Sequence, residues 1–195
     1  MDTSIKIKKS IKYMSNNKQK MINMYKVLGL ELIDNGIWFL RKAFHLKPKK
    51  TSRSYIQSFL VNKGMPIGKM FFADNNYFYT DIDTMKDIIL HDWTDKKKYE
   101  EDINDCDDFA FNFKSNMQER YHITAVALAR SIEISNVKTG KFIDWHRANV
   151  FLADENNVLK LWFLEPQTDK VVEIVNYNQL INLTGWLNRL NIFDF

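Results

Sequence analysis

The sequence predicts an α+β fold, in which one helix packs on a small antiparallel sheet, and three observations support this fold class. First, Asp105 precedes a run, residues 106–117, whose apolar side chains repeat at helical spacing. Second, residues 145–152 and 158–164 are rich in strand-forming residues and flank a cluster of turn residues, which favours a hairpin. Third, residues 123–129 carry apolar side chains on both faces, as an interior strand does.

The chain of 195 residues, 45% of them hydrophobic, is long enough to bury a core in one domain and to carry an extension. Its single cysteine excludes an internal disulfide framework and a multi-cysteine zinc site, which fits a reducing compartment. The sequence contains no apolar run of about 18 residues and no apolar segment followed by a cleavage site near its start. We therefore expect no transmembrane helix, no signal peptide and an intracellular location.

Positive charge is concentrated at one end of the chain. Residues 1–53 contain thirteen Lys and Arg against three Asp and Glu, a net charge of +10, so the remainder carries −6. This part has amphipathic stretches and ends in a polar segment, residues 47–52, which predicts a basic helical arm (1–53) and a linker before an α+β domain (54–195). The arm suits contact with nucleic acid, an acidic assembly partner or a membrane surface, and equally suits a solvated face. No nucleic-acid-binding motif is present.

Within the predicted domain, residues 69–73 and 77–79 read as a hairpin or as a pair of short extended segments. A helix is expected from Asp83, because the apolar residues that follow share one helical face. The charged segment 92–105 lacks such a face and is expected to be a loop beside the cysteine. A strand at 171–174 and a helical segment at 178–190 are expected to follow the hairpin.

Cys106 is the only cysteine and stands at the predicted helix start. The positive end of a helix dipole favours a thiolate, which is the nucleophilic form. Negative charge on Asp105, Asp107 and Asp108 within the same turn opposes this effect. A cation bound there would reverse the sign.

His146 is the best candidate base among the four histidines. A four-residue loop, 154–157, would put His146 directly opposite Glu165 on the paired strand. The carboxylate could then hydrogen-bond and orient the imidazole. His122, at the start of the predicted interior strand, is the second choice.

These residues carry a family resemblance. The order Asp-Cys-Asp-Asp-Phe-Ala, a histidine 40 residues after the cysteine and Glu-Pro-Gln a further 19 on resembles the papain-like protease domain of the Marasmius oreades agglutinin and its relatives, many of them phage-encoded. The match covers residues 99–174. It implies a papain-like fold with Cys106 as nucleophile, His146 as base and Glu165 as the residue that orients the histidine.

The resemblance also implies calcium-dependent proteolysis. Hard cations prefer oxygen ligands, so Asp107 and Asp108 are the candidate ligands, with Gln167 as an additional one. A phage-encoded protein could also be associated with a virion.

Two positions depart from the papain-like pattern. Glu100 stands where such enzymes have a glutamine that donates to the oxyanion, so the donors must come from elsewhere. The backbone N–H of Cys106 is one candidate, with the side chain of Asn104 or Gln167 as another. Arg147 is larger than the usual residue after the histidine and could narrow the cleft or bind an acidic substrate group.

The function predicted from these features is that of a calcium-dependent, papain-like cysteine peptidase with a Cys-His-Glu triad. Another thiol acyl transferase, such as a transglutaminase or a peptidoglycan amidase, remains open. So does a non-catalytic structural or interaction protein, such as a virion component anchored by the basic arm.

Overall fold

A computed structural model describes residues 36–37, 41–44, 46–101, 103–135, 139, 142–182 and 192–195 of the chain. The chain divides into two compact units, Met1–Ala43 and Phe44–Phe195. Most of the predicted basic arm lies outside the described residues, and the fold below is that of the second unit. In the part of the chain that is described, no helix combines the length and apolarity needed to cross a membrane.

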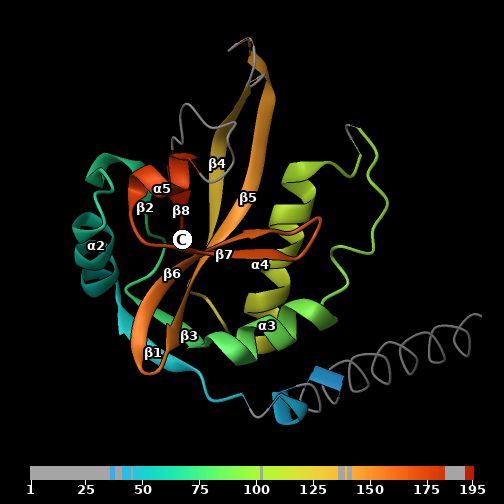
Figure 1. Ribbon diagram of the computed structural model, residues 1–195. Coiled ribbons are helices and arrows are strands. Elements are labelled where there is room, and N and C mark those ends of the chain that lie inside the picture. Colours follow the sequence, from blue (N-terminus) through green and yellow to red (C-terminus); the bar gives the residue numbers. More distant parts are fainter. Residues whose placement is uncertain are drawn as a thin grey trace, which may run out of the picture. The chain divides into compact units, whose positions relative to one another are not determined.

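The second unit has a mixed α/β fold built on an open sheet (Figure 1). Its helices are α2 (Arg53–Asn62), α3 (Ile82–His91), α4 (Cys106–Tyr121) and α5 (Tyr177–Asn182), with a 3-10 turn at Ile67–Lys69. Its strands are β1 (Lys49–Ser52), β2 (Met70–Phe71), β3 (Asn76–Asp81), β4 (Val126–Ser135), β5 (Phe142–Glu155), β6 (Val158–Glu165), β7 (Lys170–Ile174) and β8 (Ile192–Asp194). The strand order is β1-β3-β5-β4-β8-β2, and β6 pairs with both β5 and β7.

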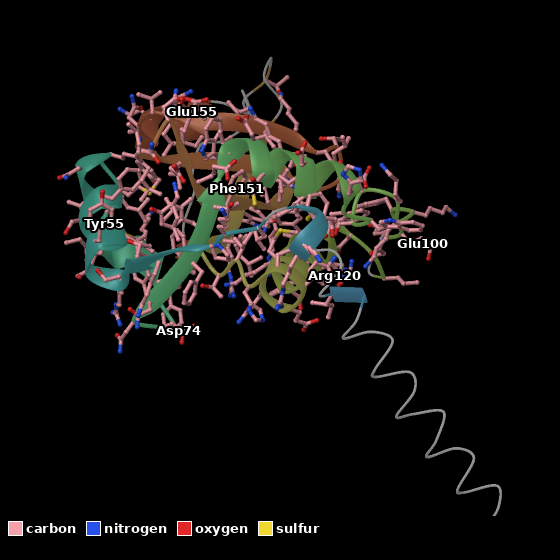
Figure 2. The ribbon with its side chains drawn as sticks, turned by 90° about the horizontal axis from the view of Figure 1, so that it is seen from below. Tyr55, Asp74, Glu100, Arg120, Phe151 and Glu155 are labelled. Atoms are coloured by element: carbon pink, nitrogen blue, oxygen red, sulfur yellow. The ribbon has the colours of Figure 1, made fainter. Side chains whose placement is uncertain are left out.

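Apolar side chains alternate along β5 and fill a core on each face of the sheet. Val150 and Leu152 pack on the face that α2 covers. Phe151 and Ala153 pack on the opposite face, against α3 and α4. Figure 1 shows α2 and α4 on either side of the sheet, and Figure 2 shows Phe151 deep inside the unit. Burial on both faces explains the apolar character of these strands and holds α4 against β5.

The segment predicted as a linker is part of this unit. Residues 49–52 form β1, which pairs antiparallel with β3. The Nζ of Lys49 also donates to the nearly buried carboxylate of Asp154 at 2.8 Å. The compact unit therefore begins at Phe44, earlier than the predicted boundary after Arg53, because backbone pairing and an ion pair tie the polar segment to the sheet.

Of the two arrangements expected for residues 69–73 and 77–79, the structure has the pair of short extended segments and not the hairpin. The first segment contains β2, which pairs in parallel with β8, and the second lies in β3, which pairs with β1 and β5. Each strand pairs with a strand that lies far away in the sequence. The helix expected from Asp83 is present as α3, begins one residue earlier at Ile82 and is capped by Asp81, whose carboxylate accepts the N–H of Thr84 at 2.8 Å.

Candidate active site

Helix α4 begins at Cys106, which confirms the predicted helix start. The carboxylate of Asp105, the N-cap, accepts the N–H of Asp107 at 3.1 Å. The carboxylate of Asp108 accepts the N–H of Asp105 at 3.2 Å, and together these contacts form a capping box. They satisfy N–H groups for which the first turn of a helix offers no acceptor, and Cys106 lies half-buried at this capped end.

The β5–β6 hairpin has a register different from the predicted one. Its turn consists of Asn156 and Asn157 alone, with φ of 52° and 63°. The predicted four-residue loop is therefore wrong, and the ladder is displaced by two residues, so that His146 and Glu165 are not directly opposed. A displacement of two preserves the alternation of faces, so the two side chains remain on the same side of the sheet as diagonal neighbours.

The structure brings His146, Glu165 and Cys106 together. The Nε2–H of His146 donates to Oε2 of Glu165 at 2.6 Å. The backbone N–H of Gln167 donates to Oε1 of the same carboxylate at 3.5 Å. The imidazole also hydrogen-bonds the side chain of Cys106, for which Nδ1 is the ring nitrogen left available. One ring therefore connects the thiol at the start of α4 to a carboxylate at the end of β6.

A β-bulge on β4 lies next to His146. Ala129 pairs with Ala148 and Ile132 with His146, so β4 carries one residue more than β5 across this step. Bulges bend a strand and change the direction in which its neighbours' side chains point. No pattern in the sequence predicted this irregularity.

The surroundings of His146 favour the imidazolium. Burial lowers the pKa of the ring, but the hydrogen bonds to Cys106 and Glu165 and the charge of Glu165 outweigh it and raise the pKa to about 9. The ring is therefore protonated at neutral pH when both partners are in place. A cation beside a thiol favours the nucleophilic thiolate.

Arg147 contacts a carboxylate of its own chain. Its Nη1 donates to Oδ2 of Asp107 on α4, and its guanidinium lies 5.7 Å from the centre of the Phe111 ring. An acidic group of a substrate would therefore have to compete with Asp107 for the guanidinium of Arg147. Asp107 also lies against Asp105, and the hydrogen-bonded contact between the two carboxyls raises the pKa of Asp107 and lowers that of Asp105.

Asn149 is a residue of the site that the sequence reasoning missed. It is fully buried, and its Nδ2 donates to the carbonyl of Ala110 on α4 at 3.0 Å and to that of Ala127 on β4 at 3.5 Å. The available signal was a single amide in the apolar run 148–153. A buried polar group in such a run needs a partner, and here the partner is the helix that begins at Cys106.

The predicted oxyanion donors lie in different places. The Nδ2 of Asn104 donates to the carbonyl of Lys98 at 2.5 Å, within the loop before α4. Gln167 lies beside Glu165 and contacts it through its backbone N–H. Glu100 pairs with Asn104 through backbone hydrogen bonds and lies at the outer edge of the unit, as Figure 2 shows.

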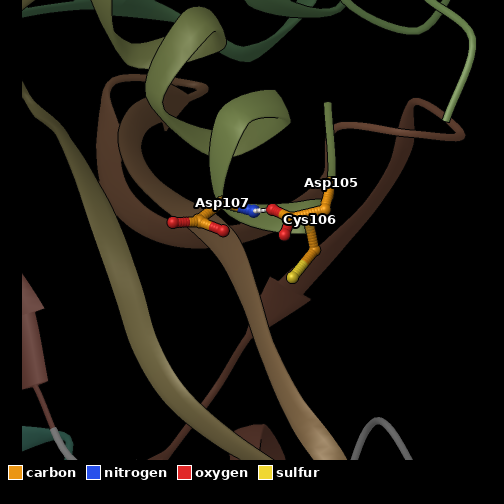
Figure 3. Close-up of side chains that lie close together, drawn as sticks. All are labelled: Asp105, Cys106 and Asp107. Atoms are coloured by element: carbon orange, nitrogen blue, oxygen red, sulfur yellow. Dashed lines mark hydrogen bonds between the residues drawn. The ribbon is translucent and has the colours of Figure 1, made fainter. Parts of the chain in front are cut away.

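The residues near Cys106 do not fit the predicted calcium site. The carboxylate of Asp108 serves the capping box, and that of Asp107 binds Arg147. Asp105, Cys106 and Asp107 offer ligand atoms within 4.8 Å of one another, but one of these atoms is sulfur, whereas calcium takes six to eight oxygens. Figure 3 shows the three side chains together at the start of α4, with the N–H of Asp107 directed at the Asp105 carboxylate.

His122, the second-choice base, lies at the opposite end of α4. It is the C-cap residue of that helix, with φ of 56°, and lines a pocket of about 480 Å³ with Phe78 and Gln118. A helix of 16 residues spans about 24 Å, so His122 is too far from Cys106 to accept its proton.

No family model and no curated protein matches this chain. Among solved structures, the chain is similar to a complex of PSL1a with E-64, with a TM-score of 0.55 and 17% identity over 75% of this chain and 51% of that chain. A crystal structure of the Polyporus squamosus lectin bound to a human-type influenza-binding epitope has a TM-score of 0.49 and 19% identity over 63% of this chain and 45% of that chain.

PSL1a is a fungal lectin whose fold is papain-like and related to that of the Marasmius oreades agglutinin. At this low identity the similarity concerns the fold alone. The chain spans about half the length of the structures it matches.

Proposed function

We propose that this chain is a cysteine peptidase of papain-like architecture, related to the protease domain of the Marasmius oreades agglutinin. The observation that carries the proposal is the hydrogen-bonded series of Cys106, His146 and Glu165 at the start of a capped helix. A nucleophile, a base and a group that orients the base are the three parts that thiol acyl transfer requires.

In the proposed reaction, the Cys106 thiolate attacks the carbonyl carbon of a peptide bond and forms a tetrahedral intermediate. His146 holds the proton of the thiol and gives it to the leaving amine, so that a thioester remains on Cys106. Water then attacks the thioester with His146 as general base, and the carboxylic acid product leaves. Glu165 keeps the ring in the tautomer and orientation that serve both steps and stabilises the imidazolium.

The negative oxygen of the intermediate needs hydrogen-bond donors. We assign one donor to the backbone N–H of Cys106, because first-turn N–H groups have no intrahelical acceptor and point towards the positive end of the dipole. The side chain of Gln167, next to Glu165, is the better of the two predicted side-chain donors. Asn104 already uses its amide on the carbonyl of Lys98.

The PSL1a complex supports the proposed reactivity of Cys106. E-64 is an epoxide that alkylates cysteine thiolates, and the structure of its complex with a protein similar in fold to this chain has been solved. We extend this reactivity to Cys106 as part of the proposal.

The test is alkylation of the full chain by E-64, followed by intact-mass measurement, with hydrolysis of a casein-type substrate in parallel. We expect one adduct, on Cys106, and hydrolysis that the reagent abolishes. Cys106→Ala should take no label, and His146→Ala should react slower by about a hundredfold or more. Asp83→Asn, which changes an exposed carboxylate on α3, is the matched control.

Slow labelling that is the same in the wild type and in His146→Ala would contradict the proposal and leave only a half-buried thiol. Labelling without hydrolysis of any peptide, together with release of cell-wall fragments, would favour an amidase. No labelling at all would favour the non-catalytic alternative.

A further inference from the structure

We propose that Arg147 is a positioning residue that supplies, from within the chain, the positive charge needed beside the acidic first turn of α4, so that Cys106 and His146 are aligned without a metal ion. This inference rests on the proposed function. It also replaces the calcium ion that the sequence predicted.

Three carboxylates lie close together beside Cys106. Asp105, Asp107 and Asp108 all stand within one turn of the start of α4, where like charges repel one another. The guanidinium of Arg147 binds the Asp107 carboxylate directly. An arginine keeps its charge at every pH that matters, so this compensation is permanent.

The place of Arg147 in the chain links the charge to the catalytic geometry. Arg147 follows His146 on β5 and points to the opposite face of the sheet, towards α4. Asn149, two residues on, points to the same face and donates to the carbonyl of Ala110 on α4. Two polar contacts therefore connect the strand of the base to the helix of the nucleophile, one of them at the turn that holds Cys106.

The guanidinium is also held in place from the side. The Phe111 ring, one turn further along α4, lies 5.7 Å from it, within the range of a cation–π contact. Arg147 is only partly buried, so this ion pair contributes little to folding. Its removal should consequently affect the site more than the stability of the fold.

A bound calcium ion would have to share the Asp107 carboxylate with this contact. The ion and the guanidinium would use the same carboxylate, Asp107, while Asp108 is engaged in the capping box. The guanidinium therefore supplies the positive charge that a metal ion would otherwise supply.

The test measures the alkylation of Cys106 by E-64 in the full chain. The maximum rate of alkylation and the affinity for E-64 are determined separately, once with calcium present and once with a chelator. We expect the wild type to react equally in both. Arg147→Ala should lower the maximum rate about tenfold with little change in affinity, as a small misalignment of reacting groups does. Arg147→Lys, which keeps the charge, should recover most of this loss.

Arg130→Ala is the matched control, because its guanidinium also lies against Phe111, at 6.0 Å, and belongs to a neighbouring strand. It should react like the wild type. Asp107→Asn should recover much of the rate lost in Arg147→Ala, because it removes the carboxylate whose charge the guanidinium compensates.

Three results would overturn the inference: slower wild-type labelling in chelator, unchanged labelling in Arg147→Ala, or Arg147→Lys no faster than Arg147→Ala. Thermal unfolding of each variant shows whether a loss of labelling is caused by misfolding. If Arg147→Ala is misfolded, the labelling rate of Arg147→Lys tests the inference instead. If His146→Ala reacts like the wild type, the proposed function fails and the inference with it. If His146→Ala is slow and Arg147→Ala is not, the inference alone fails.

Discussion

The imidazole of His146 hydrogen-bonds Glu165 through one ring nitrogen and Cys106 through the other. These two contacts determine the protonation of His146. The carboxylate accepts from Nε2 at 2.6 Å, which leaves Nδ1 for the sulfur. Both contacts are stronger when the ring is charged, so folding and protonation of His146 are coupled.

Stability should depend on the protonation of His146. The ring has an unfolded pKa of 6.5 and a folded pKa of about 9, so its contribution to stability is complete below about pH 6.5 and is lost as the pH rises through 9. The difference between the two values corresponds to on the order of 3 kcal/mol. Glu165→Gln should bring the folded pKa towards 6.5 and remove most of this pH dependence.

Urea unfolding between about pH 6 and pH 10 and NMR titration of the ring would measure this prediction. Glu173→Gln is the control, because that carboxylate lies on β7 and pairs with Lys160. The same imidazole titration in wild type and Glu165→Gln would contradict the assignment.

At the scale of elements, α4 and the β5–β6 hairpin supply the geometry of the site. The capping box determines where α4 begins and hence where Cys106 lies. The two-residue turn sets the register of the hairpin, and the register decides which face Glu165 occupies.

Replacement of the N-cap should affect both stability and reactivity. Asp105→Ala removes the acceptor of the Asp107 N–H and should lower the free energy of unfolding by about 0.5–2 kcal/mol. The first turn should then fray, which slows alkylation of Cys106. Chemical denaturation and mass spectrometry measure the two effects, and Asp105→Asn, which keeps a capping oxygen, should lose much less. Equal losses in the two variants would count against the cap.

The conformation of the hairpin turn leads to a separate prediction about stability. Asn157 has a φ of 63°, which glycine adopts freely and β-branched residues avoid. Asn157→Val should therefore destabilise the fold by about 1–2 kcal/mol, while Asn157→Gly should be tolerated or stabilising. Thermal unfolding of the two variants checks this, and a stable Asn157→Val would mean that the turn has another conformation in solution.

At the scale of the whole molecule, the polar segment before α2 belongs to the globular unit. Its four residues extend the sheet through β1, and Lys49 pairs with the nearly buried Asp154. An unpaired carboxylate at that depth is unfavourable, so the segment does more than connect two parts of the chain.

Two truncations separate the observed boundary from the predicted one. Deletion of residues 1–43 should leave a cooperatively folding protein whose Cys106 reacts with E-64 as in the full chain. Deletion of residues 1–53 removes β1 and Lys49 and should destabilise the unit, because β3 loses a paired strand and Asp154 is left without its cation. Circular dichroism during thermal unfolding, together with the labelling rate, tests both. Equal stability of the two truncated proteins would show that β1 contributes nothing.

The sequence by itself determined the local features of this protein. The helix start at Cys106, the helix α3, the interior strand β4 and the two strands of the His146 hairpin follow from caps, turn residues and apolar periodicity. These signals act between residues a few positions apart, so a single sequence contains them in full.

Only the tertiary structure decided which distant groups meet. Residues 49–52 became a strand, β2 paired with β8, and Arg147 bound Asp107 rather than remaining free at the site. Such pairings depend on burial and on competition among all available partners, which no local pattern encodes. The hairpin illustrates the difference: its predicted register was wrong by two residues, yet His146 and Glu165 met because strand faces alternate with a period of two.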